Sequence, residues 1–178
     1  MNRRTALRTA FVFSAGIMVL PSCLQKDEAT LSLKNIAVSA ADEKMVAQIA
    51  ETIIPTSNFI GATGLKSHEF ILMMVDDCYP PDMQQKYTTG LAQFSKMVLA
   101  KYGHAFAACT PQQKKEWLTV VENKTALPLE LLKFYQITKQ HTLQAFTSCK
   151  PFMVDVRKYT MVPGSNFKGC VSLKQKAV

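Results

Sequence analysis

The sequence lacks the short motifs that mark most enzymes, nucleotide sites and metal sites. It has no Cys-x-x-Cys pair, which excludes a thioredoxin-type redox motif, a zinc knuckle and covalent haem attachment. It also has no Gly-x-Gly-x-x-Gly, Gly-x-Ser-x-Gly or His-Glu-x-x-His, so no Rossmann nucleotide site, hydrolase elbow or zinc-protease helix is expected. The histidines His68, His104 and His141 are far apart in the chain, and each is interpreted as a surface or capping residue. We therefore expect no catalytic, cofactor-binding or metal-binding residue in this chain.

A block of like charge is also missing, although the formal net charge is +8. Three of these charges belong to Arg3, Arg4 and Arg8, which leaves about 8 − 3 = +5 for the rest of the chain. The lysines are scattered and often stand beside acidic residues, whereas a nucleic-acid-binding protein has a clustered basic face. The lysines therefore indicate a solvated surface, and no nucleic-acid partner is expected.

The apolar run near the start of the chain is too short to cross a bilayer. It extends from Ala10 to Leu20, about half of the roughly 20 residues that a spanning helix needs. A basic head precedes it and a small residue follows it, which is the layout of a secretory signal. The segment Leu20-Pro21-Ser22-Cys23 resembles a bacterial lipobox. We therefore interpret residues 1–22 as a lipoprotein signal peptide and Cys23 as the lipidated first residue of the mature protein.

The pair Arg3-Arg4 resembles the twin-arginine signal that directs folded proteins to export. Residues 23–38 are interpreted as the lipidated cysteine followed by a tether. These features predict a protein of the cell envelope, lipid-anchored to a membrane and facing the periplasm. The charged stretch Leu24–Glu28 resembles the tag of some cell-surface lipoproteins, so a cell-surface location stays open as the alternative.

The rest of the chain indicates an all-α fold, because apolar residues recur at helical spacing and no alternating strand pattern is present. Ser39 and Thr110 are predicted N-caps, and Gly103 is a predicted C-cap. With the prolines, these signals predict helices over residues 40–54, 67–77, 82–102, 111 through at least 121, 128–148 and 152–156. We therefore expect a single compact helical domain over residues 39–178, with about five or six helices and an extended tail from Tyr159.

Two of the predicted helices have unusual interiors. The centre of the second helix, Phe70–Val75, is apolar all round, which predicts that it is the buried central helix. Gly90 lies inside the third helix and is expected to weaken it by about 1 kcal/mol relative to alanine.

Four cysteines follow Cys23 in the sequence: Cys78, Cys109, Cys149 and Cys170. An exported protein meets conditions in which disulfides persist, and four cysteines allow three pairings, all of which remain open at this point. Cys109 lies just before a predicted helix start, where a thiolate is favoured.

Three segments of the chain together form a distinctive set of motifs. The first is Ile49–Pro55, which ends in an Ile-Ile-Pro stop, and the second is the Asp-Cys-Tyr-Pro-Pro turn within Asp76–Pro81. The third is Tyr159–Gly164, which ends in Val-Pro-Gly and is followed by a Gly-Cys pair at Gly169 and Cys170. Together these three segments resemble the gluconate 2-dehydrogenase subunit 3 family, and the resemblance covers nearly the whole mature chain.

The resemblance implies a small, non-catalytic subunit that assists the export, stability or membrane attachment of a larger FAD-dependent (GMC-type) sugar or polyol dehydrogenase. A cytochrome c subunit is a further implied partner, and FAD is expected in the large subunit. The resemblance also implies a disulfide between Cys78 and Cys170 that pins the tail, and such a link contributes about 4 kcal/mol in the chain-entropy model. The implied partner contacts are Asp77, Tyr79, Pro80, Pro81, Pro163 and Gly164.

The alternative hypothesis is a free-standing cell-envelope lipoprotein without a flavoprotein partner. It would have a binding or thiol-redox role, and Cys109 and Cys149 are the residues that keep it open. A reactive cysteine needs exposure and a lowered pKa, which a sequence alone does not report.

Overall fold

The computed structural model describes residues 31–123 and 127–160, and these residues form helices and no strand. The all-α prediction is therefore confirmed for this part of the chain. Its α-helices are α2 (Ala40–Ile53), α3 (Ser67–Cys78), α4 (Pro81–Tyr102), α5 (Pro111–Glu122) and α6 (Leu129–Ser148). Two short helical turns, η1 (Phe106–Ala108) and η2 (Phe152–Val156), follow α4 and α6.

The ends of the helices follow the local chemistry of the sequence. The Ser39 hydroxyl accepts from the Asp42 amide, while the Asp42 side chain accepts from the Ser39 amide, which completes the predicted capping box of α2. Thr110 and Gln113 form the same arrangement at the start of α5. Gly103 ends α4 with a left-handed φ of 76°, the conformation that favours glycine.

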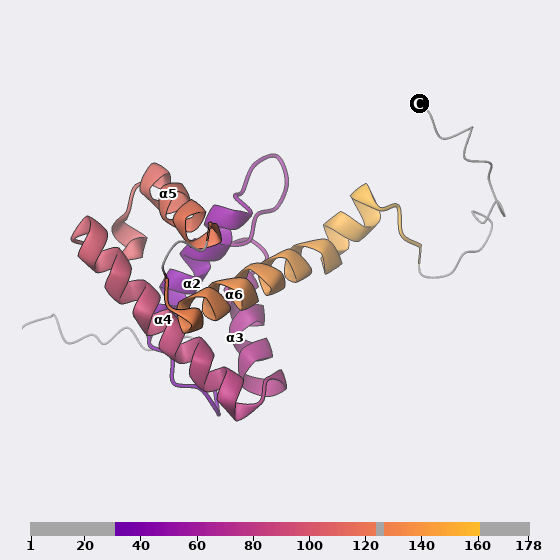
Figure 1. Ribbon diagram of the computed structural model, residues 1–178. Coiled ribbons are helices and arrows are strands. Elements are labelled where there is room, and N and C mark those ends of the chain that lie inside the picture. Colours follow the sequence, from indigo (N-terminus) through magenta and orange to yellow (C-terminus); the bar gives the residue numbers. More distant parts are fainter. Residues whose placement is uncertain (1–30, 124–126, 161–178) are drawn as a thin grey trace, which may run out of the picture.

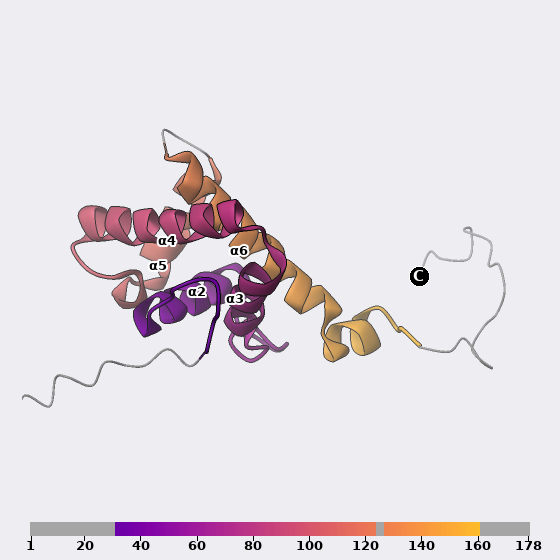
Figure 2. The same cartoon turned by 90° about the horizontal axis from the view of Figure 1, so that it is seen from below.

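The central helix of the bundle is α6. It packs against α4, α3 and α2, and both views show it running through the bundle and extending beyond it (Figures 1 and 2). The prediction that residues 70–75 form an all-round buried helix is wrong, because α3 lies at the side of the bundle and Met73 is 46% exposed. An apolar surface residue of this kind is common, so the continuous apolar run overstated the burial of α3.

Aromatic rings fill the core between α4, α5 and α6. The Phe94 ring contacts the rings of Phe106, Trp117 and Phe134, at centroid distances of 5.3, 6.0 and 5.6 Å. These four side chains are almost fully buried. Such rings remove large apolar areas from water, and through Trp117 this cluster attaches α5 to the bundle.

Gly90 marks the crossing of α4 over α6. A Cβ atom at this position would lie 2.1 Å from the carbonyl oxygen of Glu130 and 2.7 Å from the Cβ of Phe134. The glycine therefore has a packing role that outweighs its low helix propensity, because it allows the two helix backbones to approach closely.

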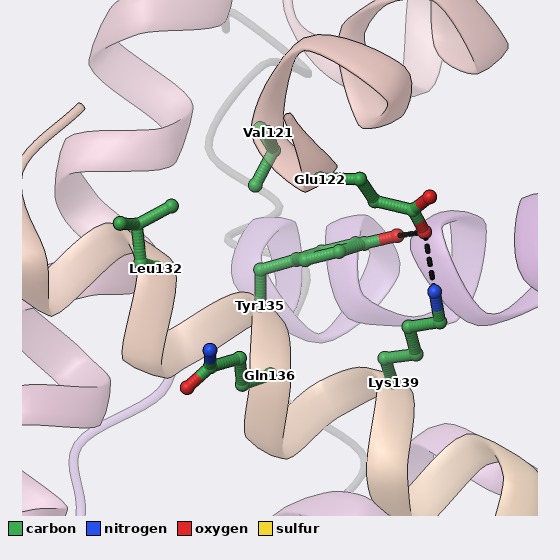
Figure 3. A pocket seen from close by; sticks show the side chains of 6 residues that line it. All are labelled: Val121, Glu122, Leu132, Tyr135, Gln136 and Lys139. Carbon is green, nitrogen blue, oxygen red and sulfur yellow. Dashed lines mark hydrogen bonds and ion pairs between the residues drawn. The ribbon is translucent and has the colours of Figure 1, made fainter. Parts of the chain in front are cut away.

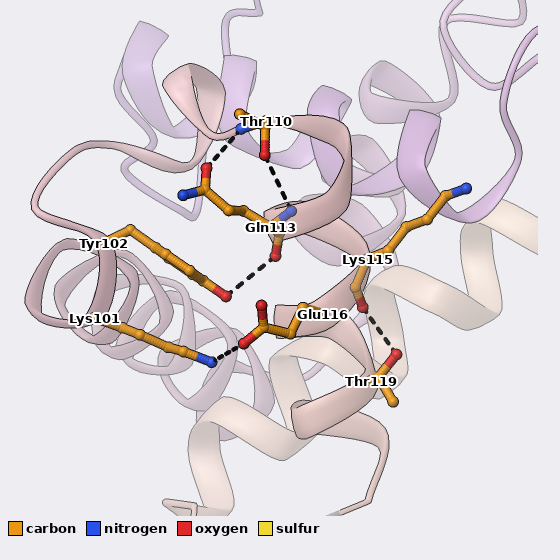
Figure 4. Close-up of polar contacts among 7 residues, drawn as sticks. All are labelled: Lys101, Tyr102, Thr110, Gln113, Lys115, Glu116 and Thr119. Carbon is orange, nitrogen blue, oxygen red and sulfur yellow. Dashed lines mark hydrogen bonds and ion pairs between the residues drawn. The ribbon is translucent and has the colours of Figure 1, made fainter.

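A polar clamp joins the end of α4 to the start of α5 (Figure 4). The Lys101 ammonium group lies 2.6 Å from the Glu116 carboxylate, and the Tyr102 hydroxyl donates to the Gln113 carbonyl at 3.3 Å. The ion pair is exposed, and such pairs contribute little to stability. Its main effect is therefore to fix the direction in which α5 leaves η1.

The C-terminal end of α6 projects from the bundle and leads into η2 (Figures 1 and 2). The ring of Phe146 contacts those of Phe59 and Phe152 at 5.6 and 5.2 Å, which ties the base of this projection to the loop after α2. The predicted short helix at residues 152–156 is confirmed.

Within the described residues, no helix is both long enough and apolar enough to span a membrane.

Candidate partner interface

The turn between α3 and α4 contains four of the residues that the sequence analysis proposed as partner contacts. Asp77, Pro80 and Pro81 are exposed, and the Tyr79 side chain is half-buried. Pro81 is the first residue of α4, where the missing amide hydrogen has no consequence for the helix. The remaining two proposed contacts, Pro163 and Gly164, lie outside the described residues, and contact by any of the six stays a prediction.

The turn is attached to α6 through Tyr79 and His141. The Tyr79 hydroxyl lies 3.0 Å from Nε2 of His141, and Nδ1 of His141 lies 2.9 Å from the Gln144 side-chain oxygen. These partners fit an imidazole that donates from Nδ1 and accepts at Nε2. Burial, and secondarily the neighbouring Cys78, raises the pKa of Tyr79, so its hydroxyl remains a hydrogen-bond donor.

The interpretation of His141 as a surface or capping residue is wrong, because only 3% of it is exposed. Its ring contacts the rings of Phe70 and Tyr79 at 5.9 and 5.7 Å. A usable sequence signal did exist, because His141 stands seven residues after the buried Phe134 and three after the buried Thr138. This spacing places it on the inner stripe of α6.

The carboxylate of Asp76 fixes the segment that precedes α2. It accepts the backbone amides of Lys34, Asn35 and Ile36 at 2.9, 2.7 and 2.9 Å. In return, the Asn35 and Gln84 side chains both donate to the Asp76 carbonyl at 2.8 Å. The end of α3 therefore binds an extended segment that lies 40 residues earlier in the chain.

This arrangement corrects the predicted tether of residues 23–38. Ile36 belongs to the hydrophobic core with 6% exposure, and Leu31, Leu33 and Val38 pack against that core. Residues 31–38 are thus part of the folded body, and the remainder of the predicted tether lies outside the described residues.

Asp76 and Asp77 are neighbours in sequence with opposite environments. Asp76 is buried, which by itself raises its pKa, but the three backbone amides outweigh burial and hold the pKa below its usual value. Asp77 is exposed to solvent. The turn therefore has a rigid inner side and an open outer side.

The loop after the Ile-Ile-Pro segment is closed by Glu51. Its carboxylate oxygens accept the amides of Thr56 and Thr63 at 2.8 and 2.9 Å. Burial raises the pKa of Glu51, but these hydrogen bonds, first from Thr63 and then from Thr56, lower it overall. Gly61 permits the closure, because a Cβ atom there would lie 2.4 Å from the Thr56 amide nitrogen.

A second polar cluster lies in the cleft between α5 and α6 (Figure 3). One oxygen of Glu122 accepts from the Tyr135 hydroxyl at 2.7 Å and from the Lys139 ammonium group at 2.5 Å. The Lys139 and Tyr135 hydrogen bonds lower the pKa of Glu122, while burial and Glu122 raise that of Tyr135. At neutral pH Glu122 therefore stays ionised and Tyr135 stays protonated, which keeps both hydrogen bonds in place.

These three residues separate two hollows. The smaller, with a cavity volume of about 270 Å³, is also lined by Val121, Leu132 and Gln136. The larger, of about 500 Å³, opens between α2, α5 and α6. Its lining combines the apolar Ile53, Leu118 and Leu143 with polar side chains, among them Thr52, Lys115 and Thr119.

The described cysteines do not form disulfides. Cys78, Cys109 and Cys149 are all free, and Cys170 lies outside the described residues, so nothing in the structure supports the predicted disulfide-pinned tail. Cys109 is 5% exposed, and its sulfur lies 3.5 Å from Nδ1 of His104. Burial raises its pKa, opposed only partly by Lys114. The expectation of a favoured thiolate at this helix start is therefore wrong.

Over residues 31–123 and 127–160, no three His, Cys, Asp or Glu side chains come together in a way that could hold a metal ion.

Comparison with known proteins places these features in one family. The family model described as "Gluconate 2-dehydrogenase subunit 3" matches residues 40–164. The match begins at the first residue of α2 and includes the whole of the turn at residues 76–81. No curated protein and no solved structure matches the chain.

Proposed function

The chain belongs to the gluconate 2-dehydrogenase subunit 3 family, and on that premise we propose that it is the non-catalytic accessory subunit of an FAD-dependent sugar or polyol dehydrogenase. The observation that carries this proposal is the turn between α3 and α4. Its Asp77, Pro80 and Pro81 face solvent, while Tyr79 and Asp76 bind it to α6 and to residues 34–36. A rigid turn loses little conformational freedom on binding, which favours its use as a docking element.

The proposed location is the periplasmic face of a membrane, with a lipid anchor at Cys23. The segment between Cys23 and Leu31, which packs on the core, spans 31 − 23 = 8 residues, so the anchored cysteine would lie within about 30 Å of the folded body. Because Asp76 binds Lys34 next to the turn, the anchor would hold the docking turn near the membrane. A flavoprotein bound there would acquire membrane attachment through this subunit.

The proposed export route explains why a small subunit carries the signal. A twin-arginine signal is read by a translocon that transports folded proteins, and a flavoprotein is loaded with FAD when it is folded. The pair Arg3-Arg4 would therefore direct both subunits to export as one complex. The large subunit supplies the flavin chemistry, and a cytochrome c subunit is a further proposed partner.

Two variants separate export from anchoring. In a strain that carries only the variant chain, R3K with R4K should leave both this subunit and the flavoprotein in the cytoplasm. The Cys23→Ala variant should instead release both into the soluble periplasmic fraction, because the acyl chains would be lost. Immunoblots and flavin fluorescence of the cell fractions measure both outcomes. Unchanged location and amount of the flavoprotein in both strains, and in a strain without this chain, would contradict the proposal.

A further inference from the structure

The exposed apolar side chains of the described residues are concentrated at one end of the molecule. Seven large hydrophobic residues are exposed in the described part of the chain, and four of them lie in the second half of α6 or after its end. They are Leu143, Val154, Val156 and Tyr159, with 44, 46, 55 and 53% exposure. We call this projecting part, residues 143–159, the arm. Exposed apolar residues that gather on one projecting segment in this way mark a candidate interaction site.

The arm continues into the larger hollow between α2, α5 and α6. Leu143 belongs to both, since it lines the hollow together with Ile53 and Leu118. Lys139 stands one helical turn before Leu143 on the same side of α6, and it borders the hollow at its polar edge. Leu143 thus connects the concave groove to the projecting end of the described chain.

The base of this surface is held in place by contacts within the bundle. The rings of Phe59, Phe146 and Phe152 connect the arm to the loop that Glu51 closes. On the groove side, Glu122 is bound by Tyr135 and Lys139, which fixes α5 against α6. The surface is therefore ordered before any partner binds.

The charges along this surface are mainly positive. Lys139 and Glu122 neutralise each other, which leaves Lys115, Lys150, Arg157 and Lys158 against Asp155. The net charge is 4 − 1 = +3, and none of these four cations forms an ion pair within the described residues. Exposed apolar side chains that alternate with unpaired cations match an apolar segment that carries acidic residues.

We propose that the groove and the arm form one docking surface whose occupant is an acidic amphipathic segment of the dehydrogenase's flavin-bearing subunit. This inference rests on the proposed function and adds a second contact region to the turn at residues 77–81. The apolar face of the segment would cover Leu143, Leu118 and Val156. Its acidic edge would face Lys115 on one side and Arg157 with Lys158 on the other.

The test is purification of tagged full-length protein from detergent-solubilised membranes, with the ratio of flavin absorbance to tagged chain as the readout. Leu143→Glu and Val156→Glu should each lower this ratio about tenfold or more, because each places an unpaired charge inside an apolar interface. The matched control is Leu99→Glu, because Leu99 is 54% exposed on α4, away from the arm. The control should retain the wild-type ratio. Circular dichroism spectra and melting temperatures equal to wild type show that all three variants fold.

A second experiment tests the contribution of the cationic residues separately. The double variant R157E with K158E should also lose flavin, and the wild-type complex should dissociate as the salt concentration rises.

Each outcome decides the inference. If wild type carries flavin and both arm variants carry as much, the proposed surface is wrong while the proposed function stands. If wild type carries no flavin, both fail. If the purified chain alone forms a dimer that Leu143→Glu separates, the occupant is a second copy and the inference is overturned.

Discussion

Replacing Asp76 by alanine is expected to lower the free energy of unfolding by about 2–4 kcal/mol. Three backbone amides, those of Lys34, Asn35 and Ile36, would lose a buried charged acceptor, and hydrogen bonds to charged groups contribute about 1.5–3 kcal/mol each. The total is smaller than their sum because the released segment regains water. Urea unfolding gives the change in stability, and trypsin should cleave after Lys34 much faster in the variant than in wild type.

Asp77→Ala is the matched control for this variant. Asp77 adjoins Asp76 but is exposed, so its removal should change stability by no more than about 0.5 kcal/mol. Equal effects of the two substitutions, or unchanged cleavage after Lys34 in Asp76→Ala, would contradict the role assigned to Asp76.

The contribution of Asp76 should also depend on pH. Its pKa in the folded protein lies below the unfolded value, because the backbone amides outweigh the effect of burial. Its stabilising effect is therefore fully present above the unfolded pKa, near 3.8, and is lost as the pH falls through the lower folded pKa. The stability difference between wild type and Asp76→Ala should accordingly shrink as the solution is acidified below about pH 4.

Gly90→Ala is expected to destabilise the protein by about 3 kcal/mol, the upper part of the range for overpacked cores. The added Cβ would lie 2.1 Å from the Glu130 carbonyl oxygen, and a backbone obstacle cannot move aside as a side chain does. The helices α4 and α6 would have to separate, which would loosen the packing of Phe94 on Phe134. Thermal and urea unfolding measure the effect.

Helix propensity alone makes the opposite prediction for this variant. In an exposed helix, Gly→Ala stabilises by about 1 kcal/mol. Thr89→Ala is the control, because Thr89 is the exposed neighbour in α4, and we expect it to leave stability within about 0.5 kcal/mol of wild type. A stabilised Gly90→Ala protein would show that the close approach of α4 to α6 is not required.

The ends of the helices could be predicted from the sequence because their signals are local. Each capping box joins two residues that are three positions apart, Ser39 with Asp42 and Thr110 with Gln113. No other part of the chain takes part in these hydrogen bonds. Gly103 acts through its own φ angle. These helix ends could therefore be predicted from residues that are close together in the sequence.

The identity of the central helix depends on distant partners and was missed. The inner face of α6 contains Thr138, His141 and Thr142, which look polar in sequence. Their hydrogen bonds satisfy them in the core: Thr138 pairs with the Tyr87 hydroxyl at 3.2 Å, and Thr142 donates to the Thr138 carbonyl at 2.7 Å. No sequence pattern predicts these hydrogen-bonded pairs. The apolar run of α3, in contrast, predicted more burial than α3 has in the structure.

The structure of the candidate interface could be anticipated only in part, and its contact with a partner stays a prediction. The family resemblance identified the turn at residues 77–81, which the structure shows to be largely exposed. The docking of residues 34–36 on Asp76 was missed, because it joins segments about 40 residues apart. The arm was missed as well, because the sequence pattern of α6 does not show where the helix leaves the bundle.

The measurement that tests the central claim most directly is affinity purification of the tagged protein from detergent-solubilised membranes of its own cells. Mass spectrometry identifies what is recovered with it, and the absorbance spectrum reports bound flavin. The account predicts a flavin-bearing dehydrogenase subunit at a constant ratio to this chain. Recovery of this chain alone, colourless and in full yield, would contradict it and would favour the alternative hypothesis of a free-standing protein without a flavoprotein partner.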